Sequence, residues 1–148
     1  MNLPRVFFWL SEMSHLALVD DDDAVRKALA RLLRAHDLEV RTYASPSEFL
    51  DALPENTPSC VIIDFHMPES TGVDLQRELL RRGMRVPTIV LTARDSIRQR
   101  EECRMLGAAA FLTKPVAPNE LLGAITSARG APAPRSDRTA DRVNSSSA

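Results

Sequence analysis

Cysteine, aromatic residues and net charge are all scarce in this chain of 148 residues. The two cysteines, Cys60 and Cys103, lack the CxxC spacing of a zinc site, and two thiols provide no disulfide framework. We expect both thiols to be reduced and either buried or partly buried, as in a cytoplasmic protein. The formal net charge of −1 gives no overall bias toward nucleic acid or membranes. No apolar stretch approaches the roughly 20 residues of a membrane-spanning helix.

Short apolar runs alternate with stretches of helical periodicity along the chain. The expected strands are residues 15–19, 38–43, 60–64, 87–91 and 108–113. The expected helices are residues 24–36, 46–53, 72–82, 95–106 and 119–128. Such alternation predicts an α/β fold, in which a parallel sheet carries helices on both faces. An apolar content of 44% is enough for one domain with a real core.

The two ends of the chain do not follow this pattern. Residues 1–14 contain the apolar segment Val6–Leu10, which is too short for a secretory signal and has no cleavage site after it. Two interpretations stay open: an extension before a true start at Met13, or a short docking helix. Residues 129–148 are rich in Pro, Ser and Arg, and we expect them to be disordered. The folded domain is therefore expected to span residues 15–128.

Two helix starts carry capping signals. Asp22 or Asp23 is expected to cap the first helix, where a carboxylate also favours the positive end of the helix dipole. Ser45 is the expected cap of the second helix, with Pro46 at its first position and Glu48 completing a capping box.

The chain is organised around residues 60–68. An unbroken apolar run ends in the carboxylate of Asp64, and Pro68 and Gly72 then stop the extended pattern. Continuous apolar strands are typical of the interior of a parallel sheet. Asp64 is therefore expected at the carboxyl end of a central strand, which is the edge where open α/β sheets bind ligands.

Other strands deliver polar side chains to the same edge. Asp20 and Asp21 follow the first strand, Thr92 the fourth and Lys114 the fifth. Carboxylates in one cleft repel unless a cation lies between them, and oxygen ligands without His or Cys favour magnesium. With Thr92 as a hydrogen-bond donor and Lys114 as a cation, the group describes a phosphate site in which Asp64 is the candidate nucleophile.

Each of these residues also has an ordinary structural explanation. Asp20 and Asp21 could be solvated residues before a helix. Thr92 alone is a common strand-end residue, Lys114 alone is a common surface cation, and Phe111 alone is typical of a core. Their joint occurrence, in order and at successive strand ends, favours the phosphate site.

Four segments together resemble the CheY-like receiver domain of two-component response regulators: Val19–Asp22, Ile63–Pro68, Leu91–Ala93 and Phe111–Pro115. The resemblance covers about residues 15–128. It implies a three-layer α/β/α sandwich of the flavodoxin-like type, with a five-stranded parallel sheet in the order 2-1-3-4-5. The first helix and the alanine-rich last strand look closest to FixJ-type receivers.

The resemblance implies a role for each residue at the strand edge. Asp64 is similar to the phospho-accepting aspartate of the family. Asp20 and Asp21 resemble the acidic pair that holds Mg²⁺ together with Asp64 and the backbone carbonyl of His66. Lys114 looks like the lysine that contacts the phosphate. A domain of this kind is not an ordinary enzyme, since it catalyses only its own phosphorylation and dephosphorylation.

Further positions resemble the conformational switch of the family. Thr92 looks like the hydroxyl that moves to the phosphoryl group, and Ala93 like the residue whose backbone contacts that group. Phe111 stands where the family has a rotating aromatic residue, often Tyr, and keeps the ring without the hydroxyl. Pro115 is expected to follow a cis peptide bond.

His66 and Arg94 lie two residues after Asp64 and Thr92, at positions that adjust phosphoryl hydrolysis in the family. Both side chains can be cationic here. We expect them to screen the phosphate from water and so to alter autodephosphorylation.

The same resemblance implies the partners. A sensor histidine kinase or a phosphotransfer protein would dock on the first helix near Val25 and supply the phosphoryl group. An unknown downstream protein would read the changed surface, and a phosphorylation-dependent homodimer is a further alternative. Neither direct binding of nucleic acid nor a membrane association is expected.

Three functions stay open from the sequence. The first is a stand-alone receiver that acts through protein contacts. The second is the receiver half of a DNA-binding transcription factor, of which this chain would be a fragment. The third is a haloacid-dehalogenase-like phosphohydrolase, which also uses an Asp nucleophile. That family needs a second Asp at the position of His66, so this function is disfavoured.

Overall fold

A computed structural model describes residues 15–54 and 57–130 of the chain. The strands are β1 (Leu16–Val19), β2 (Val40–Tyr43), β3 (Cys60–Asp64), β4 (Thr88–Thr92) and β5 (Ala108–Thr113). The helices are α2 (Asp23–Ala35), α3 (Pro46–Ala52), α4 (Gly72–Arg81), α5 (Ile97–Met105) and α6 (Pro118–Gly130). α6 continues through Arg129 and Gly130, two residues beyond its predicted end. In this described part, no helix is both long and apolar enough to cross a membrane.

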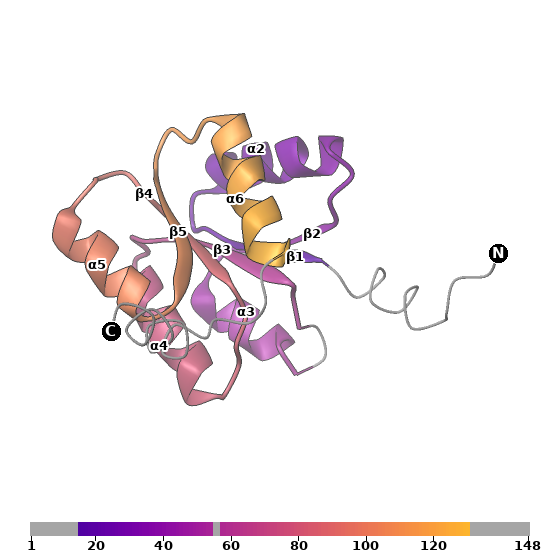
Figure 1. The fold of residues 1–148 in the computed structure, drawn as a ribbon. Coiled ribbons are helices and arrows are strands. Elements are labelled where there is room, and N and C mark those ends of the chain that lie inside the picture. The colour runs from indigo at the N-terminus through magenta and orange to yellow at the C-terminus, as the bar shows by residue number, and fades with distance from the viewer. Residues whose placement is uncertain (1–14, 55–56, 131–148) are drawn as a thin grey trace, which may run out of the picture.

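The strands form one parallel sheet between two layers of helices (Figure 1). The strand order is β2-β1-β3-β4-β5. The predicted α/β/α sandwich and its order 2-1-3-4-5 are therefore confirmed. The predictions for residues 1–14, including a start at Met13, and for tail residues 131–148 lie outside the described residues.

Helix capping follows the local rules with one difference from the prediction. Ser45 caps α3 by accepting a hydrogen bond from the backbone N–H of Glu48 at 3.2 Å. The Glu48 carboxylate accepts from the N–H of Ala44 at 2.8 Å, so the return bond goes to the residue before the cap. A complete capping box instead opens α4, where Thr71 and Asp74 each accept from the other's backbone N–H.

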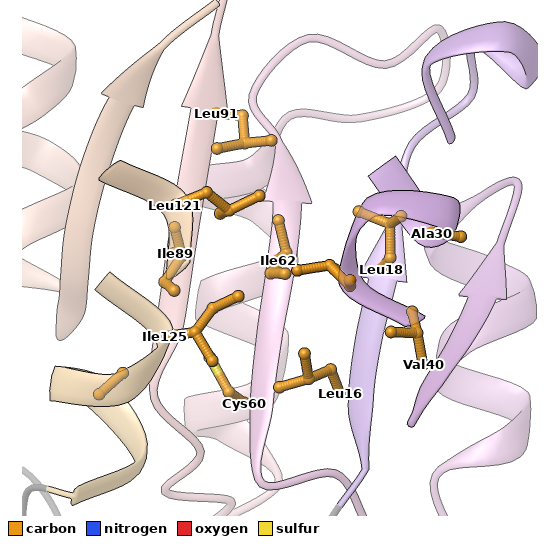
Figure 2. Packing of buried hydrophobic residues seen from close by; sticks show 12 residues of the cluster. Leu16, Leu18, Ala30, Val40, Cys60, Ile62, Ile89, Leu91, Leu121 and Ile125 are labelled. Carbon is orange, nitrogen blue, oxygen red and sulfur yellow. The ribbon is translucent and has the colours of Figure 1, made fainter. Parts of the chain in front are cut away.

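Successive side chains along each strand point to opposite faces of the sheet, so the core is divided between the two sides. Leu16 and Leu18 of β1 point toward α2 and α6, whereas Ala17 and Val19 point toward α3 and α4. On the first side, aliphatic side chains of β1, β2, β3 and β4 pack against both helices (Figure 2). Full burial of one such side chain contributes about 2 kcal/mol, so this cluster is a main source of stability.

A smaller cluster lies under α4 and α5 on the second side. Its buried members are Phe65, Val73, Val90, Cys103 and Phe111. Cys103 is the one buried residue of α5, and the other side chains of this helix are mostly polar. The carboxyl ends of β3, β4 and β5 adjoin this cluster, which places it beside the edge where the predicted site lies.

Candidate functional site

Carboxylates from two strands meet at one edge of the sheet. Asp20 and Asp21 directly follow β1, and Asp64 is the last residue of β3. β1 and β3 are neighbours, with Val19 paired to Ile63, so their carboxyl ends coincide. One oxygen atom from each of the three carboxylates lies within 4.8 Å of the others. Asp20 and Asp64 are buried and Asp21 is exposed, so the cluster opens to solvent on one side.

Lys114 connects two of these carboxylates. Its Nζ donates to Oδ2 of Asp20 at 3.1 Å and lies 3.0 Å from Oδ1 of Asp64. Asp20 and Lys114 are 94 positions apart in sequence, so the fold alone brings them together. The backbone N–H of Lys114 donates to the carbonyl of Thr92 at 2.6 Å, which holds the end of β5 beside β4. The peptide bond between Lys114 and Pro115 is cis.

Asp64 and Lys114 each have a pKa above the ordinary value for their side chain, for different reasons. Burial raises the pKa of Asp64 because the charged form loses water, and this outweighs the hydrogen bond from Lys114. Burial alone would lower the pKa of Lys114, but its hydrogen bond to Asp64 and its attraction to Asp20 raise it. Repulsion from Asp20 and Asp21 also contributes to the raised pKa of Asp64. A second cation at this edge would relieve that repulsion.

Arg26, which the sequence reasoning did not single out, fixes the loop that carries the acidic pair. Its Nη1 donates to the carbonyl of Asp20 at 2.8 Å, and its Nη2 pairs with Asp23 at 2.5 Å. The Asp20 carboxylate also accepts from the N–H of Asp22 at 2.9 Å. Asp22 in turn caps α2 by accepting from the N–H of Val25 at 3.1 Å. The available signal was the i, i+3 spacing of Asp23 and Arg26, which suits a helical ion pair.

Thr92, Ala93 and Arg94 form the end of β4 and the turn that follows. Thr92 is fully buried. Its hydroxyl donates to the carbonyl of Arg94 at 2.9 Å and accepts from the N–H of Arg94 at 3.1 Å. The hydroxyl is thus bonded to its own turn, while Ala93 and the Arg94 side chain are exposed beside it.

A group of aromatic rings connects Asp64 to α5. The ring of Phe65 lies 4.7 Å from the ring of His66 and 6.5 Å from the ring of Phe111, measured between centroids. Phe111 is 8% exposed, so its ring occupies an inward position. The guanidinium of Arg100 lies 5.2 Å from the Phe111 centroid and covers the ring from the α5 side. His66 itself is exposed at the strand edge.

Gly72 allows α4 to begin directly behind Asp64. A Cβ atom there would come within 3.3 Å of the Asp64 carbonyl oxygen and 3.2 Å of a methyl carbon of Ile63. The N–H of Gly72 donates to the carbonyl of Phe65 at 2.8 Å. The close approach therefore holds the segment after Asp64 against the start of the helix.

Most of the chain matches one known protein family. Residues 16–126 match the model of the response regulator receiver domain. The chain is 38% identical over 131 residues to the response regulator protein TodT of Pseudomonas putida, with 88% of this chain and 57% of TodT covered. It is 37% identical over 113 residues to the transcriptional regulatory protein FixJ of Azorhizobium caulinodans, with 76% and 54% covered. The chain thus spans about half the length of these curated relatives.

Solved structures agree with this match. A response regulator receiver protein from Burkholderia phymatum is 40% identical, with a TM-score of 0.71, and the match covers 82% of this chain and 98% of that one. The chemotaxis protein CheY4 of Vibrio cholerae is 26% identical, with a TM-score of 0.73 and coverage of 78% and 98%. The CheY-like resemblance inferred from the motifs is confirmed, and FixJ among the relatives is consistent with the FixJ-type subclass.

Proposed function

Since the chain belongs to the family of response regulator receiver domains of two-component systems, we propose that Asp64 accepts a phosphoryl group from a histidine of a sensor kinase or phosphotransfer protein in the cytoplasm. The observation that carries this proposal is the Lys114 ammonium, which lies 3.1 Å from Asp20 and 3.0 Å from Asp64. Receiver domains are signalling domains rather than ordinary enzymes. The chemistry proposed is therefore one transfer onto the chain itself, followed by hydrolysis.

In the proposed transfer, a carboxylate oxygen of Asp64 attacks the phosphorus of the donor phosphohistidine. An O–P bond forms and the P–N bond breaks. The electron pair of the broken bond stays on the imidazole nitrogen, which takes up a proton from water. The Lys114 ammonium, already within 3.0 Å of the attacking carboxylate, stabilises negative charge on the phosphoryl oxygens.

Asp20, Asp21 and Asp64 are the residues that would hold Mg²⁺, with the backbone carbonyl of His66 as a further ligand. The donor set fits, because three carboxylate oxygens within 4.8 Å suit a hard divalent cation. When bound, Mg²⁺ supplies positive charge against the incoming phosphoryl group. Treatment with EDTA is expected to abolish phosphorylation of Asp64.

Thr92 and Phe111 are proposed to carry the change from Asp64 to the surface. A phosphoryl group adds strong acceptor oxygens at the strand edge. The Thr92 hydroxyl would leave the backbone of Arg94 for these oxygens, and the N–H of Ala93 would donate to them. The Phe111 ring could then rotate and change the surface of α5, β5 and α6, which an unidentified protein or a second copy would read.

Acetyl phosphate with Mg²⁺ tests the acceptor directly. Mass spectrometry of the intact chain is expected to show one added phosphoryl group, which Asp64→Ala abolishes. Asp51→Ala changes an exposed aspartate on α3 and serves as the matched control. A phosphoryl group retained in Asp64→Ala, or lost in Asp51→Ala, would contradict the assignment.

His66 and Arg94 are proposed to set the lifetime of the phosphoryl group. Both side chains are exposed at the edge that carries Asp64. Cationic groups there would hold the phosphate oxygens and hinder attack by water. The substitutions His66→Asn and Arg94→Glu are expected to change the decay rate, followed by mass after removal of acetyl phosphate. An unchanged rate in both variants rejects this role.

A DNA-binding regulator is the second candidate for the output. The relative FixJ is named a transcriptional regulatory protein, and the chain spans 54% of its length. An immunoblot of the native protein, with an antibody raised against residues of α2, distinguishes a DNA-binding regulator from a stand-alone receiver. A product about twice as long as this chain favours the DNA-binding regulator, and a product of this length favours a stand-alone receiver that acts through protein contacts.

A further inference from the structure

A basic groove lies between α2 and the strand β2. It encloses about 420 Å³ and is lined by Arg26, Lys27, Ala30, Arg31, Arg34 and Thr42. Ala30 is 2% exposed and packs in the same core cluster as Val40 of β2 (Figure 2). Ala30 therefore forms the floor of the groove, and the cationic side chains surround it.

The positive charge of the groove is only partly neutralised. Asp23 pairs with Arg26 at 2.5 Å and with Lys27 at 2.9 Å. Within residues 15–54 and 57–130, no carboxylate lies within ion-pair distance of Arg31 or Arg34, and both side chains are exposed. The chain as a whole has a net charge of −1, so this excess of positive charge is local. It would attract an anionic partner to this side of the molecule.

The groove also borders an open edge of the sheet, because β2 is the first strand of the order and pairs only with β1 in the part of the chain that the structure describes. The carbonyl of Glu39 accepts a hydrogen bond from the N–H of Leu16 in β1 at 2.8 Å, and the carbonyl of Tyr43 accepts one from the N–H of Asp20, directly after β1, at 3.1 Å. Backbone groups alternate sides along a strand, so those of the intervening residues Val40 and Thr42 point away from β1. Arg34 donates to the Val40 carbonyl at 2.9 Å and covers part of this edge.

We propose that this groove binds an extended acidic segment of a partner protein, which adds to the edge of β2. The backbone of such a segment would pair with the outward N–H and C=O groups of Thr42, as in other cases of strand addition. Its carboxylates, on the side chains that alternate toward α2, would meet Arg31 and Arg34. A nucleic acid would match the charge but has no row of amide groups at strand spacing, so the open edge favours a polypeptide.

A capped synthetic octapeptide of alternating Glu and Thr is the probe for this site, titrated into the ¹⁵N-labelled full chain at low salt. We expect saturable shifts of the Val40 and Thr42 amides and weaker binding as salt is added. Arg31→Glu is expected to weaken the peptide about tenfold, because it places a like charge opposite the peptide carboxylates. Arg98→Glu, an exposed arginine on α5, is the matched control and is expected to bind as the unchanged chain does.

Three results would overturn the proposal. The first is the absence of saturable shifts at Val40 and Thr42. The second is an equal loss of affinity in Arg31→Glu and Arg98→Glu, which would show a general charge effect. The third is displacement of the peptide by an eight-residue thymidine oligonucleotide at lower concentration, which would assign the groove to nucleic acid. Phosphorylation of Asp64 by acetyl phosphate is expected to persist in Arg31→Glu, so this test is separate from that of the acceptor site.

Discussion

On one side of the sheet, α2 and α6 close over a continuous cluster of aliphatic side chains, whereas on the other side α3, α4 and α5 cover two separate clusters. α5 buries only Cys103, and its end residues Ile97 and Met105 are 87% and 76% exposed. The side-chain amide of Gln76 on α4 is buried and donates hydrogen bonds to Thr88 of β4 and to the Cys103 carbonyl of α5. A helix with so few buried apolar contacts opens more easily than one fixed by a continuous core. We therefore expect the first side to be rigid and α5 to be adjustable.

The weakly packed helix α5 lies beside the residues that are proposed to move, Thr92 and Phe111. Thr92 ends β4 just before α5, and Phe111 lies in the cluster that α5 covers. Asp20 instead directly follows β1 and Asp64 ends β3, and the apolar side chains of these two strands are completely buried on both faces of the sheet. A rigid frame can hold the acceptor while an adjacent helix changes position, which is what a two-state signalling domain requires.

The largest expected effect is the loss of stability when the rigid side is truncated. Leu33 of α2 is fully buried in the first cluster, so Leu33→Ala is expected to lower the free energy of unfolding by about 3 kcal/mol. Cys103→Ala on α5 removes only the thiol group and is expected to lower the free energy of unfolding by about 1 kcal/mol. Urea denaturation measures both. Equal costs would show that the two sides are held equally firmly.

The reaction rates of the two thiols compare how readily α5 and the α2–α6 side of the sheet open. Burial raises the pKa of Cys60 to about 12 and that of Cys103 to about 11, so at pH 8 both are protonated in the folded chain. An aromatic disulfide reagent then reacts only after the structure opens. We expect Cys103 under α5 to react roughly tenfold faster than Cys60 on the rigid side. The variants Cys60→Ala and Cys103→Ala isolate each thiol, and equal rates would mean that α5 opens only with the whole fold.

Much of this frame could be predicted from the sequence because local signals agreed with the fold. The apolar runs at β1 and β3 have few alternatives to a buried strand. Gly83 and Gly107, the residues that directly follow the predicted helices 72–82 and 95–106, adopt left-handed backbone with φ of 73° and 95°. Asp64 and Lys114 could be placed together because the carboxyl ends of parallel strands share one edge.

Other features depend on packing and could not be predicted in the same way. Gln76 is a polar residue in a helix, and only the positions of Thr88 and Cys103 explain why it is buried. The direction of the Thr92 hydroxyl depends on the shape of the turn after β4. Arg26 could form several contacts, and the loop conformation selects the carbonyl of Asp20.

Gln76→Leu tests whether this polar contact holds α4 and α5 together, and its effect is expected to be smaller. The side-chain amide donates to the hydroxyl of Thr88 at 3.2 Å and to the carbonyl of Cys103 at 3.1 Å. Its Oε1 is buried without a hydrogen-bond partner in the described part of the chain. Leu would lose two hydrogen bonds but also remove that unpaired oxygen, so the net cost is expected to be about 1 kcal/mol. A loss as large as that of Leu33→Ala would show that polar contacts, not apolar packing, hold the second side.

The smallest expected effect concerns the ring that α5 covers. Arg100 contacts the face of Phe111 at 5.2 Å and pairs with Asp95 at 2.8 Å, so it connects the ring to the segment between β4 and α5. An exposed cation–π contact contributes about 0.5 kcal/mol. Arg100→Ala is therefore expected to change the global stability little but to raise the population of an outward Phe111 about twofold.

A fluorine label on the Phe111 ring makes this change visible by ¹⁹F NMR, as a second resonance or a shift toward the position seen after phosphorylation. Arg98→Ala removes an exposed arginine one residue after Ile97, the first residue of α5, and is the matched control. If both variants leave the resonance unchanged, the Arg100 contact does not affect the position of the Phe111 ring. The ring is then held inward by Phe65 and the neighbouring core. If Arg100→Ala alone shifts it, the weakly packed side contains a contact that biases the unphosphorylated state, and α5 is adjustable because so little else fixes it.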